Sequence, residues 1–366
     1  MKNNRRKFVK DLTSTALGIT IIPRNVMGKG FIAPSDRFNI GVIGLGAQSG
    51  GLIERMSKIS DARIIAGCDV HQKRLNRFRK LIDTQYKKYK IKGAAKIYED
   101  FDKLIENSNI DGIVVSTPDH WHAIPAINAM KAGKHVYCEK PMSHTIQEGR
   151  AMEKIAREYN CTLQTGSMQR SRADFRNACQ LVRNGYIGKI EKVWIEVGNP
   201  SATCNLPFQE TPDYLNWDKW LGPAPLRSYH DIIVEKGWFP NWRWYREYGG
   251  GILSDWGAHM FDIVQWALDK DHTGPVKYEA PMEPTASRGL VMHYDDGVEV
   301  EHRNFGRGFA VRFFGSNGTL DISRSFFETN PKDLLNIKFK STDIKLYVSE
   351  SHENDWVTSA KEGSKP

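Results

Sequence analysis

The chain has 366 residues, 40% hydrophobic and 26% charged, a composition typical of a globular protein with more than one domain. Its net charge of +9 is concentrated in residues 1–35 and 71–96, whereas a nucleic-acid-binding surface spreads basic residues along one face, so nucleic-acid binding is not expected. Five scattered cysteines without a CxxC pair argue against a disulfide framework or zinc site, and no apolar run is long enough to span a bilayer.

Residues 1–35 are predicted to be an export leader. The stretch Asn4-Arg5-Arg6-Lys7-Phe8-Val9-Lys10 resembles the twin-arginine signal, Ser-Arg-Arg-x-Phe-Leu-Lys. The weakly apolar residues 12–22 that follow suit the hydrophobic region of such a signal and are too few and too polar for a membrane helix. We therefore expect a periplasmic protein, or a cytoplasmic one if the leader does not function.

Residues 36–160 have the pattern of a dinucleotide-binding domain. Short apolar runs alternate with longer amphipathic stretches, which predicts an α/β fold with a doubly wound parallel sheet covered by helices on both faces. The predicted strands are 38–43, 62–66, 110–115 and 134–137, and the predicted helices are 48–59, 71–91, 99–107, 121–132 and 145–159.

A glycine-rich loop joins the first predicted strand to the first helix. Gly44 permits a tight turn, and Gly46 lets backbone N–H groups approach a pyrophosphate at the helix N-terminus. A third glycine is expected at Ser49 and stands instead at Gly50, which leaves open how closely the helix packs on the strand. The predicted cofactor contacts here are Gly44, Gly46, Ala47 and Gln48.

Asp69 ends the second predicted strand, about twenty residues beyond the loop, where a carboxylate accepts hydrogen bonds from the adenosine ribose. It would repel a 2′-phosphate and therefore favours NAD, although Lys73 and Arg74 would tolerate NADP. A helix N-cap is the alternative role for Asp69.

Three further motifs follow predicted strands or begin a helix. They are VSTPDHWH at 115–122, AGKHVYCEKP at 132–141 and GGGILSDWGAH at 249–259. The first two lie beyond the carboxyl ends of strands, where ligands of such sheets bind. The four-residue spacing of Asp255 and His259 places both on one helical face, either as a catalytic pair or as a structural one.

Together these motifs resemble those of the Gfo/Idh/MocA family, NAD(P)-dependent oxidoreductases that act on sugars, inositols and their derivatives. The resemblance covers about residues 37–325. It implies an N-terminal Rossmann domain and a C-terminal α+β domain, residues 161–366, with a large, open, mainly antiparallel sheet. The outer face of that sheet often joins subunits, so a homo-oligomer is expected.

The resemblance also implies roles for single residues. Lys140, in Glu-Lys-Pro, would contact the nicotinamide ribose and the substrate hydroxyl. His259 would take the hydroxyl proton and Asp255 would orient it or bind a neighbouring hydroxyl, although Lys140 is an alternative base. The glycines 249–251 would let the backbone pass close to cofactor or substrate. No metal is expected. Further cofactor contacts are expected at Thr117, Pro118, His120, His122 and Glu139, and substrate contacts at Gln169, Arg243, Tyr245, Asp255 and His259.

The second half is predicted to contain a helix at 172–184, a strand at 190–197 and antiparallel segments at 291–302 and 309–322. A tryptophan-rich stretch, 215–245, resembles an insertion in exported members of the family, and most of its tryptophans are expected to pack in a core. The end of the chain is predicted to be a polar tail without the family's closing helix, as in a truncated chain or one completed by a partner subunit.

The leading prediction is an oxidoreductase that transfers hydride between a nicotinamide cofactor and a hydroxyl-bearing carbon of a sugar, glycoside or polyol. Because free NAD is scarce outside the cytoplasm, two alternatives use a tightly bound cofactor. They are an NAD-dependent glycosidase acting through a transient keto sugar, and a sugar transhydrogenase. Related glycosidases depart from the Glu-Lys-Pro motif that is intact here. A non-catalytic sugar or nucleotide sensor is the alternative from a different class.

Overall fold

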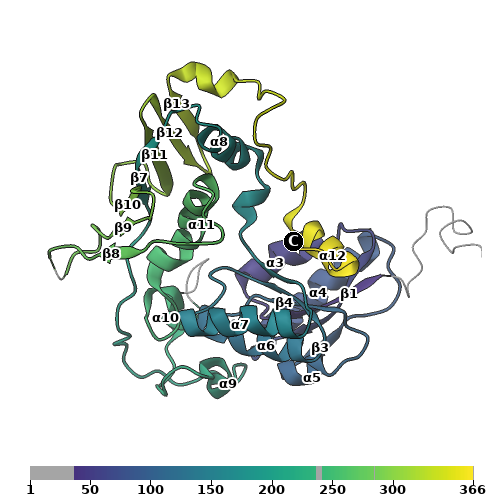
Figure 1. Cartoon of the computed structure of the whole chain (residues 1–366). Helices are drawn as coiled ribbons and strands as arrows, with labels where there is room; N and C mark the ends of the chain where they lie inside the picture. Colours follow the sequence, from purple (N-terminus) through teal and green to yellow (C-terminus); the bar gives the residue numbers. More distant parts are fainter. Residues whose placement is uncertain (1–36, 236–240, 284, 366) are drawn as a thin grey trace, which may run out of the picture. The chain divides into compact units, whose positions relative to one another are not determined.

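The computed structural model describes residues 37–365 except 236–240 and 284, so the predicted leader lies outside the described residues. The N-terminal half, coloured purple to teal in Figure 1, contains a six-stranded parallel sheet with the order β3-β2-β1-β4-β5-β6. Its strands are β1 (Phe38–Ile43), β2 (Ala62–Cys68), β3 (Lys96–Tyr98), β4 (Gly112–Val115), β5 (His135–Cys138) and β6 (Leu163–Thr165). This order, with a reversal between β1 and β4, is that of a doubly wound Rossmann sheet and confirms the predicted fold class.

Helices cover both faces of this sheet because its strands are apolar on both sides. One core contains Ile40, Leu52 and Phe78, and the other contains Ile113, Ala126 and Met152. The first lies beneath α3 (Ala47–Met56) and α4 (Gln72–Lys88), and the second beneath α5 (Phe101–Ile105), α6 (Ala123–Lys131) and α7 (Ile146–Glu158). Continuous burial of the strands therefore explains the runs of Ile and Val that the sequence shows.

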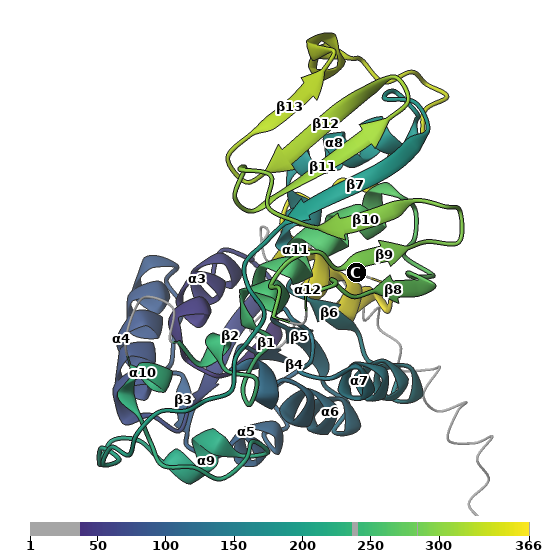
Figure 2. The ribbon, with the colours of Figure 1, turned by 90° about the vertical axis from the view of Figure 1, so that its left-hand side faces the viewer.

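The second sheet has seven strands, in which only β7 and β10 run parallel among the paired strands described. Figure 2 looks onto its open face, with α8 (Ala173–Arg183) and α11 (Gly251–Ala267) behind it. Phe175, Ile263 and Phe313 are fully buried between these helices and the sheet. The strands are β13 (Phe327–Asn330), β12 (Gly318–Ser323), β11 (Ala310–Gly315), β7 (Ile190–Glu196), β10 (Glu299–His302), β9 (Val291–His293) and β8 (Lys277–Glu279), in sheet order.

The tryptophan-rich insertion between β7 and α11 folds against the Rossmann domain. It contains α9 (Trp217–Leu221), α10 (Asp231–Val234) and the 3₁₀ helix η4 (Asn241–Trp244). Trp217 and Trp220 stack with their ring centroids 4.9 Å apart, inside an apolar cluster of the insertion. Lys219 binds Asp100 at 3.1 Å, and Leu215 forms a backbone bridge with His71. The insertion is therefore attached to residues of the Rossmann domain that lie more than 100 positions earlier in the chain.

The prediction of a polar tail without a closing helix is wrong. Residues His352–Glu362 form α12, capped by the side chain of Ser351. Its Trp356 is fully buried and contacts Phe38 and Tyr137 at centroid distances of 5.4 and 5.9 Å. Three residues of α12 join this core, Trp356, Val357 and Ala360. The other residues of the helix are mostly polar, so the sequence shows no clear apolar pattern there. In Figure 1, α12 lies beside α3.

Within the described part of the chain, no helix has the length and apolar character needed to cross a membrane. The same residues contain no group of three or more His, Cys, Asp or Glu side chains arranged to hold a metal ion.

Candidate active site

A cavity of about 230 Å³ lies at the carboxyl ends of the Rossmann strands. Its walls come from the loops after β1, β2, β4 and β5 and, on the opposite side, from Lys219, Trp220, Trp242 and Arg243 of the insertion. The cavity is thus formed between two segments that are distant in sequence. Of the described residues predicted to contact the cofactor, Gly44, Gly46, Ala47, Gln48, Asp69, Thr117, Pro118, His122, Glu139 and Lys140 line it.

The glycine loop is fixed by contacts with the neighbouring loops. Gly44 has a φ of +86°, and a Cβ there would lie 2.6 Å from the backbone nitrogen of Thr117, so only glycine fits. Asp69 accepts hydrogen bonds from the N–H groups of Leu45 (2.7 Å) and His71 (3.0 Å). Ser49 is buried and donates to the carbonyl of Gly46 at 2.8 Å, so the displaced third glycine does not prevent close packing of α3.

The cavity has the features that a dinucleotide requires. Gly46 is the N-cap of α3 and provides no side-chain cap, and the first turn of the helix has no acidic residue, so its N-terminal N–H groups are available to an anion. No atom lies within 4 Å of where a Cβ of Gly46 would be. The hydroxyl oxygen of Thr117 is buried without a hydrogen-bond partner. These orphaned donors and open space fit a pyrophosphate and its ribose groups.

The two histidines of the 115–122 motif differ in position. His122 lines the cavity, and its ring nitrogens lie 2.7 Å from the carbonyl of Pro141 and 3.0 Å from that of Thr117. His120 does not line the cavity. It lies behind the wall, 3.2 Å from the carbonyl of Trp220. Burial lowers the pKa of each to about 4, so both rings are neutral at neutral pH. The geometry therefore favours a structural role for His120.

An ion cluster joins the cavity wall to α11. Lys140, after β5 and before a cis peptide bond to Pro141, donates from Nζ to Oδ1 of Asp255 at 2.5 Å and to its carbonyl at 3.0 Å. Arg243 lies 3.3 Å from the same carboxylate. Burial acts to raise the pKa of Asp255, but the charges of Lys140 and Arg243 outweigh it and leave this pKa below its ordinary value. Asp255 is therefore ionised between two cations.

His259 follows Asp255 by one helical turn and is almost fully buried. No hydrogen bond joins the two side chains among the described residues. Instead, Nε2 of His259 lies 3.0 Å from Nη2 of Arg324, and Nδ1 is buried without a partner. Burial, together with the charges of Lys140 and Arg324, lowers the pKa of His259 to about 3, so the ring is neutral. Asp255 thus orients Lys140 rather than His259.

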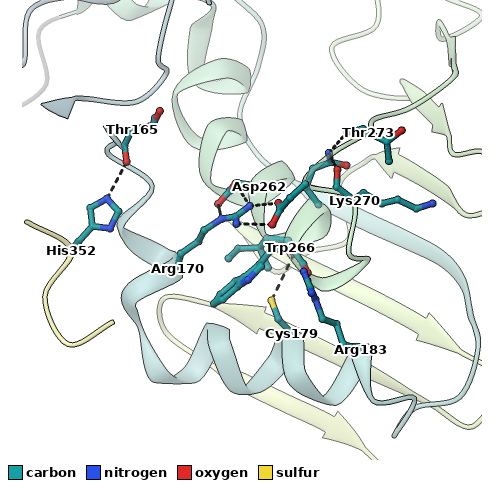
Figure 3. Close-up of polar contacts among 12 residues, drawn as sticks. Thr165, Arg170, Cys179, Arg183, Asp262, Trp266, Lys270, Thr273 and His352 are labelled. Atoms are coloured by element: carbon teal, nitrogen blue, oxygen red, sulfur yellow. Dashed lines mark hydrogen bonds and ion pairs between the residues drawn. The ribbon is translucent and has the colours of Figure 1, made fainter. Parts of the chain in front are cut away.

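Of the other predicted substrate residues, Arg243, Tyr245 and Gln169, only Arg243 lines the cavity among the described residues. Tyr245 packs against the apolar cluster of the insertion. Gln169 is buried, and its Oε1 has no hydrogen-bond partner. Arg170, next to it, holds the 3₁₀ helix η3 (Met168–Ser171) on α11 by binding Asp262 at 2.8 and 2.9 Å, as Figure 3 shows. The substrate contacts of these residues remain predictions.

That the glycines at 249–251 pass close to cofactor or substrate stays a prediction, and the structure adds a second reason for them. Gly251 has a φ of +76°, and a Cβ there would lie 2.4 Å from the backbone of Pro200 and Ser201. A Cβ on Gly249 would lie 3.1 Å from Oδ2 of Asp119. Neither glycine lines the cavity. The backbone of Pro200 and Ser201 excludes a side chain at Gly251, whereas at Gly249 the approach of Asp119 leaves little room for one.

Two charged residues of the site were not predicted from the sequence. Asp119 lines the cavity inside a motif already recognised, and burial raises its pKa to about 8, with Arg243 opposing and Asp255 adding to the rise. The motif was the available signal for Asp119. Arg324 lies just after β12 in no motif, and only the folded chain brings it to His259.

Two sequence models of one family match this chain in the order expected. Residues 38–167 match the model described as an oxidoreductase family with an NAD-binding Rossmann fold, and residues 194–305 match the C-terminal alpha/beta domain of the same family. Together the two matches cover more than half of the chain.

Individual relatives agree with this assignment. The chain is 32% identical to myo-inositol 2-dehydrogenase of Thermotoga maritima over 232 residues, which cover 63% of this chain and 55% of that protein. It is 31% identical to a glycosyl hydrolase family 109 protein of Shewanella pealeana, covering 40% of this chain and 36% of the other. The chain thus spans about half or less of the length of these curated relatives.

A solved structure supports the same fold over most of the chain. The crystal structure of aldose-aldose oxidoreductase from Caulobacter crescentus, complexed with glycerol, has a TM-score of 0.60 and 19% identity. The match covers 90% of this chain and 91% of that one. With both domain models matched in order and the cavity at the expected strand ends, this chain belongs to the Gfo/Idh/MocA family of oxidoreductases.

Proposed function

We propose that this protein is an NAD(P)-dependent oxidoreductase acting on a CH–OH group of a sugar, glycoside or polyol. One observation carries the proposal: Lys140 lies in the wall of the dinucleotide cavity and is at the same time bound to the buried carboxylate of Asp255. The charged end of Lys140 therefore links the cofactor cavity to α11, the helix that carries Asp255 and His259. The similarity to a myo-inositol 2-dehydrogenase supports a polyhydroxylated substrate.

The residues of the cavity would hold the cofactor as follows. The N-terminus of α3, with Gly46, Ala47 and Gln48, would bind the pyrophosphate, and Asp69 would accept hydrogen bonds from the adenosine ribose. Asp69 favours NAD, and Arg74, which also lines the cavity, would accommodate NADP. When bound, the nicotinamide supplies the hydride acceptor or donor.

The side chains around Lys140 would handle the substrate oxygen. The Lys140 ammonium stabilises negative charge as a hydroxyl loses its proton, and Asp255 holds that ammonium in place. His259, neutral and buried, accepts the proton through a ring nitrogen. Lys140 would be the alternative acceptor of that proton only as a neutral amine, since an ammonium has no lone pair.

The test is made on undialysed protein. It is denatured to identify any nucleotide released, and native protein is then mixed with sugars and polyols while NADH absorbance is followed. Net NADH from added NAD supports a dehydrogenase. Protein that neither binds nucleotide nor turns over any of these compounds contradicts the proposal.

A second candidate is a reaction in which a bound NAD is reduced and reoxidised within one cycle, as in a glycosidase or a transhydrogenase. The similarity to a glycosyl hydrolase family 109 protein favours the glycosidase form. In this case the protein carries stoichiometric NAD and releases an aglycone, or exchanges hydride between two sugars, without net NADH.

We also propose export through the twin-arginine pathway, on the strength of Arg5 and Arg6 in the leader. Replacing both arginines by lysine is expected to retain the protein in the cytoplasm, as followed by cell fractionation. Export of this double variant at the wild-type rate would contradict the proposal.

Finally, we propose that the open face of the seven-stranded sheet joins two copies of the chain. The aromatic side chain of Trp194 packs on Phe314 at 4.5 Å on β7 and β11. Light scattering of the wild type and of Trp194→Glu tests this, since the charge is expected to yield monomers.

A further inference from the structure

Arg324 is held against His259 of α11. It follows the last residue of β12, and its guanidinium lies 4.4 Å from the ring centroid of Trp256 on α11. Trp256 in turn stacks on Phe309, with centroids 4.2 Å apart and planes 4° from parallel. This aromatic support directs Nη2 of Arg324 to Nε2 of His259, at 3.0 Å.

This contact determines which ring nitrogen of His259 carries its proton. A guanidinium has donors only, so Nε2 must be the acceptor and the proton of the neutral ring must be on Nδ1. Nδ1 is buried without a hydrogen-bond partner. The single lone pair of the ring is therefore engaged by Arg324, and His259 accepts a substrate proton only after the guanidinium has moved.

Arg324 has spare donors and an unbalanced charge. Among the described residues it forms no ion pair, whereas Arg170, Arg243 and Arg312 each bind a carboxylate. The charges of two carboxylates, Asp255 and Glu139, act on Arg324. Both already accept hydrogen bonds from other side chains, Asp255 from Lys140 and Glu139 from Gln48. The Arg324 side chain is exposed, so a ligand from solvent can reach it.

We propose that the substrate is a sugar acid whose carboxylate binds Arg324, and that this binding releases Nε2 of His259 to take the hydroxyl proton. This inference rests on the proposed oxidoreductase function and specifies its substrate class. A carboxylate is a stronger acceptor for a guanidinium than a neutral imidazole, because the hydrogen bonds are charge-assisted and bidentate. A neutral sugar offers only hydroxyl groups and leaves Arg324 on His259. The carboxylate itself is unchanged in the reaction.

The test compares matched acids and neutral sugars. NAD-loaded protein is titrated by calorimetry with the methyl glycosides of glucose, galactose and mannose and of the three corresponding hexuronic acids, and turnover of each is measured. At least one acid is expected to bind about 10- to 100-fold more tightly than its neutral partner. Arg324→Gln is expected to remove this preference, because it weakens binding of the acid far more than binding of its neutral partner. Arg324→Lys, which keeps the charge, retains part of it.

A matched control excludes a general effect of losing an arginine. Arg63 also lies over an aromatic ring, that of Tyr86 at 5.0 Å, but belongs to the Rossmann domain. Arg63→Gln is expected to keep the acid preference. Melting temperature and NAD affinity establish that each variant is folded.

A second readout follows His259 directly. In protein labelled with ¹⁵N-histidine, the His259 signals are identified by their loss in His259→Asn. The preferred acid is expected to shift the Nε2 signal toward that of a nitrogen no longer bonded to a guanidinium, as Arg324→Gln does without ligand.

Three results would overturn the inference: equal affinity for acid and neutral partners, an acid preference unchanged by Arg324→Gln, or no binding of any acid. These results differ from failure of the proposed function. A protein that binds NAD and oxidises a neutral sugar keeps the oxidoreductase function and loses the sugar-acid assignment.

Discussion

At the scale of single residues, Lys140 connects the cofactor cavity with α11. Replacing it by methionine keeps most of the side-chain volume but removes the charge that faces the reacting oxygen and the donor to Asp255. We expect kcat to fall on the order of 10²–10³-fold, the usual cost of losing one donor to a developing oxyanion. NAD affinity should change much less, because the α3 N-terminus and Asp69 are intact.

Steady-state kinetics and NAD titration of Lys140→Met test this, with Lys58→Met as the control. Lys58 is exposed, and its ammonium forms an ion pair with the equally exposed Glu54 at 3.6 Å. A Lys140→Met enzyme with nearly wild-type kcat would show that Lys140 has no part in the chemistry.

Asp119 gives a prediction about pH. Burial raises its pKa in the folded protein to about 8, above the ordinary value of 3.8. Between these values the folded state binds more protons than the unfolded state, so Asp119 destabilises the fold increasingly as pH rises and reaches its full effect above pH 8. Asp119→Asn is neutral at every pH and should stabilise cofactor-free protein by up to about 5 kcal/mol at pH 9.

Urea unfolding at pH 5, 7 and 9 measures this effect, and the gain should be small at pH 5. Asp83→Asn, at an exposed position of α4, is the control and should show no such trend. A gain that is the same at all three pH values would contradict the raised pKa.

The residues of the site differ in how far the sequence predicts them. Lys140, Asp255 and His259 lie in motifs, so their grouping was predicted, but the partner of each was not. Asp255 binds Lys140 rather than His259, because a buried ammonium needs a counter-ion more than a neutral imidazole does. Arg324 follows His259 by 65 residues in the chain. The two meet because the second sheet packs on α11, and a sequence motif cannot predict such a contact.

At the scale of elements, a helix or strand could be predicted from the sequence when most of its residues are apolar and buried. The strand 38–43 and its parallel neighbours were predicted because nearly every residue is buried. The short strands β3, β8 and β13 have mostly exposed or half-buried residues and gave no such signal. Helix α12 is the clearest failure, since its stability depends on docking a few apolar residues against β1 and β5.

That docking is testable. Trp356→Ala should lower the free energy of unfolding by about 3–5 kcal/mol, because it opens a cavity in the core beneath α12. Trp356→Phe should cost far less, since it keeps an aromatic ring and removes an indole N–H that has no hydrogen-bond partner. Chemical unfolding of both variants provides the comparison, and an equal loss in the two would mean that ring packing does not hold α12.

At the scale of the whole catalytic region, the cofactor cavity has walls from two segments far apart in the chain. The Rossmann loops form one wall, and Trp220 and Trp242 of the insertion contribute to the other. The insertion is bound to the Rossmann domain through the contact of Lys219 with Asp100 and through Trp121 Nε1, which donates to the carbonyl of Trp220 at 2.8 Å. We infer that this wall slows the release of a bound dinucleotide.

We accordingly expect the protein to retain its cofactor through purification, and Trp220→Leu to lose it about tenfold faster or more, since each 1.4 kcal/mol of lost packing is a factor of ten. Trp244→Leu is the matched control, because Trp244 lies in the same insertion but is largely exposed and does not line the cavity. Stopped-flow fluorescence of bound NADH, chased with excess NAD, measures both rates. If the two variants released NADH at the wild-type rate, the insertion would not retain the cofactor, and an exported enzyme would need another source of NAD.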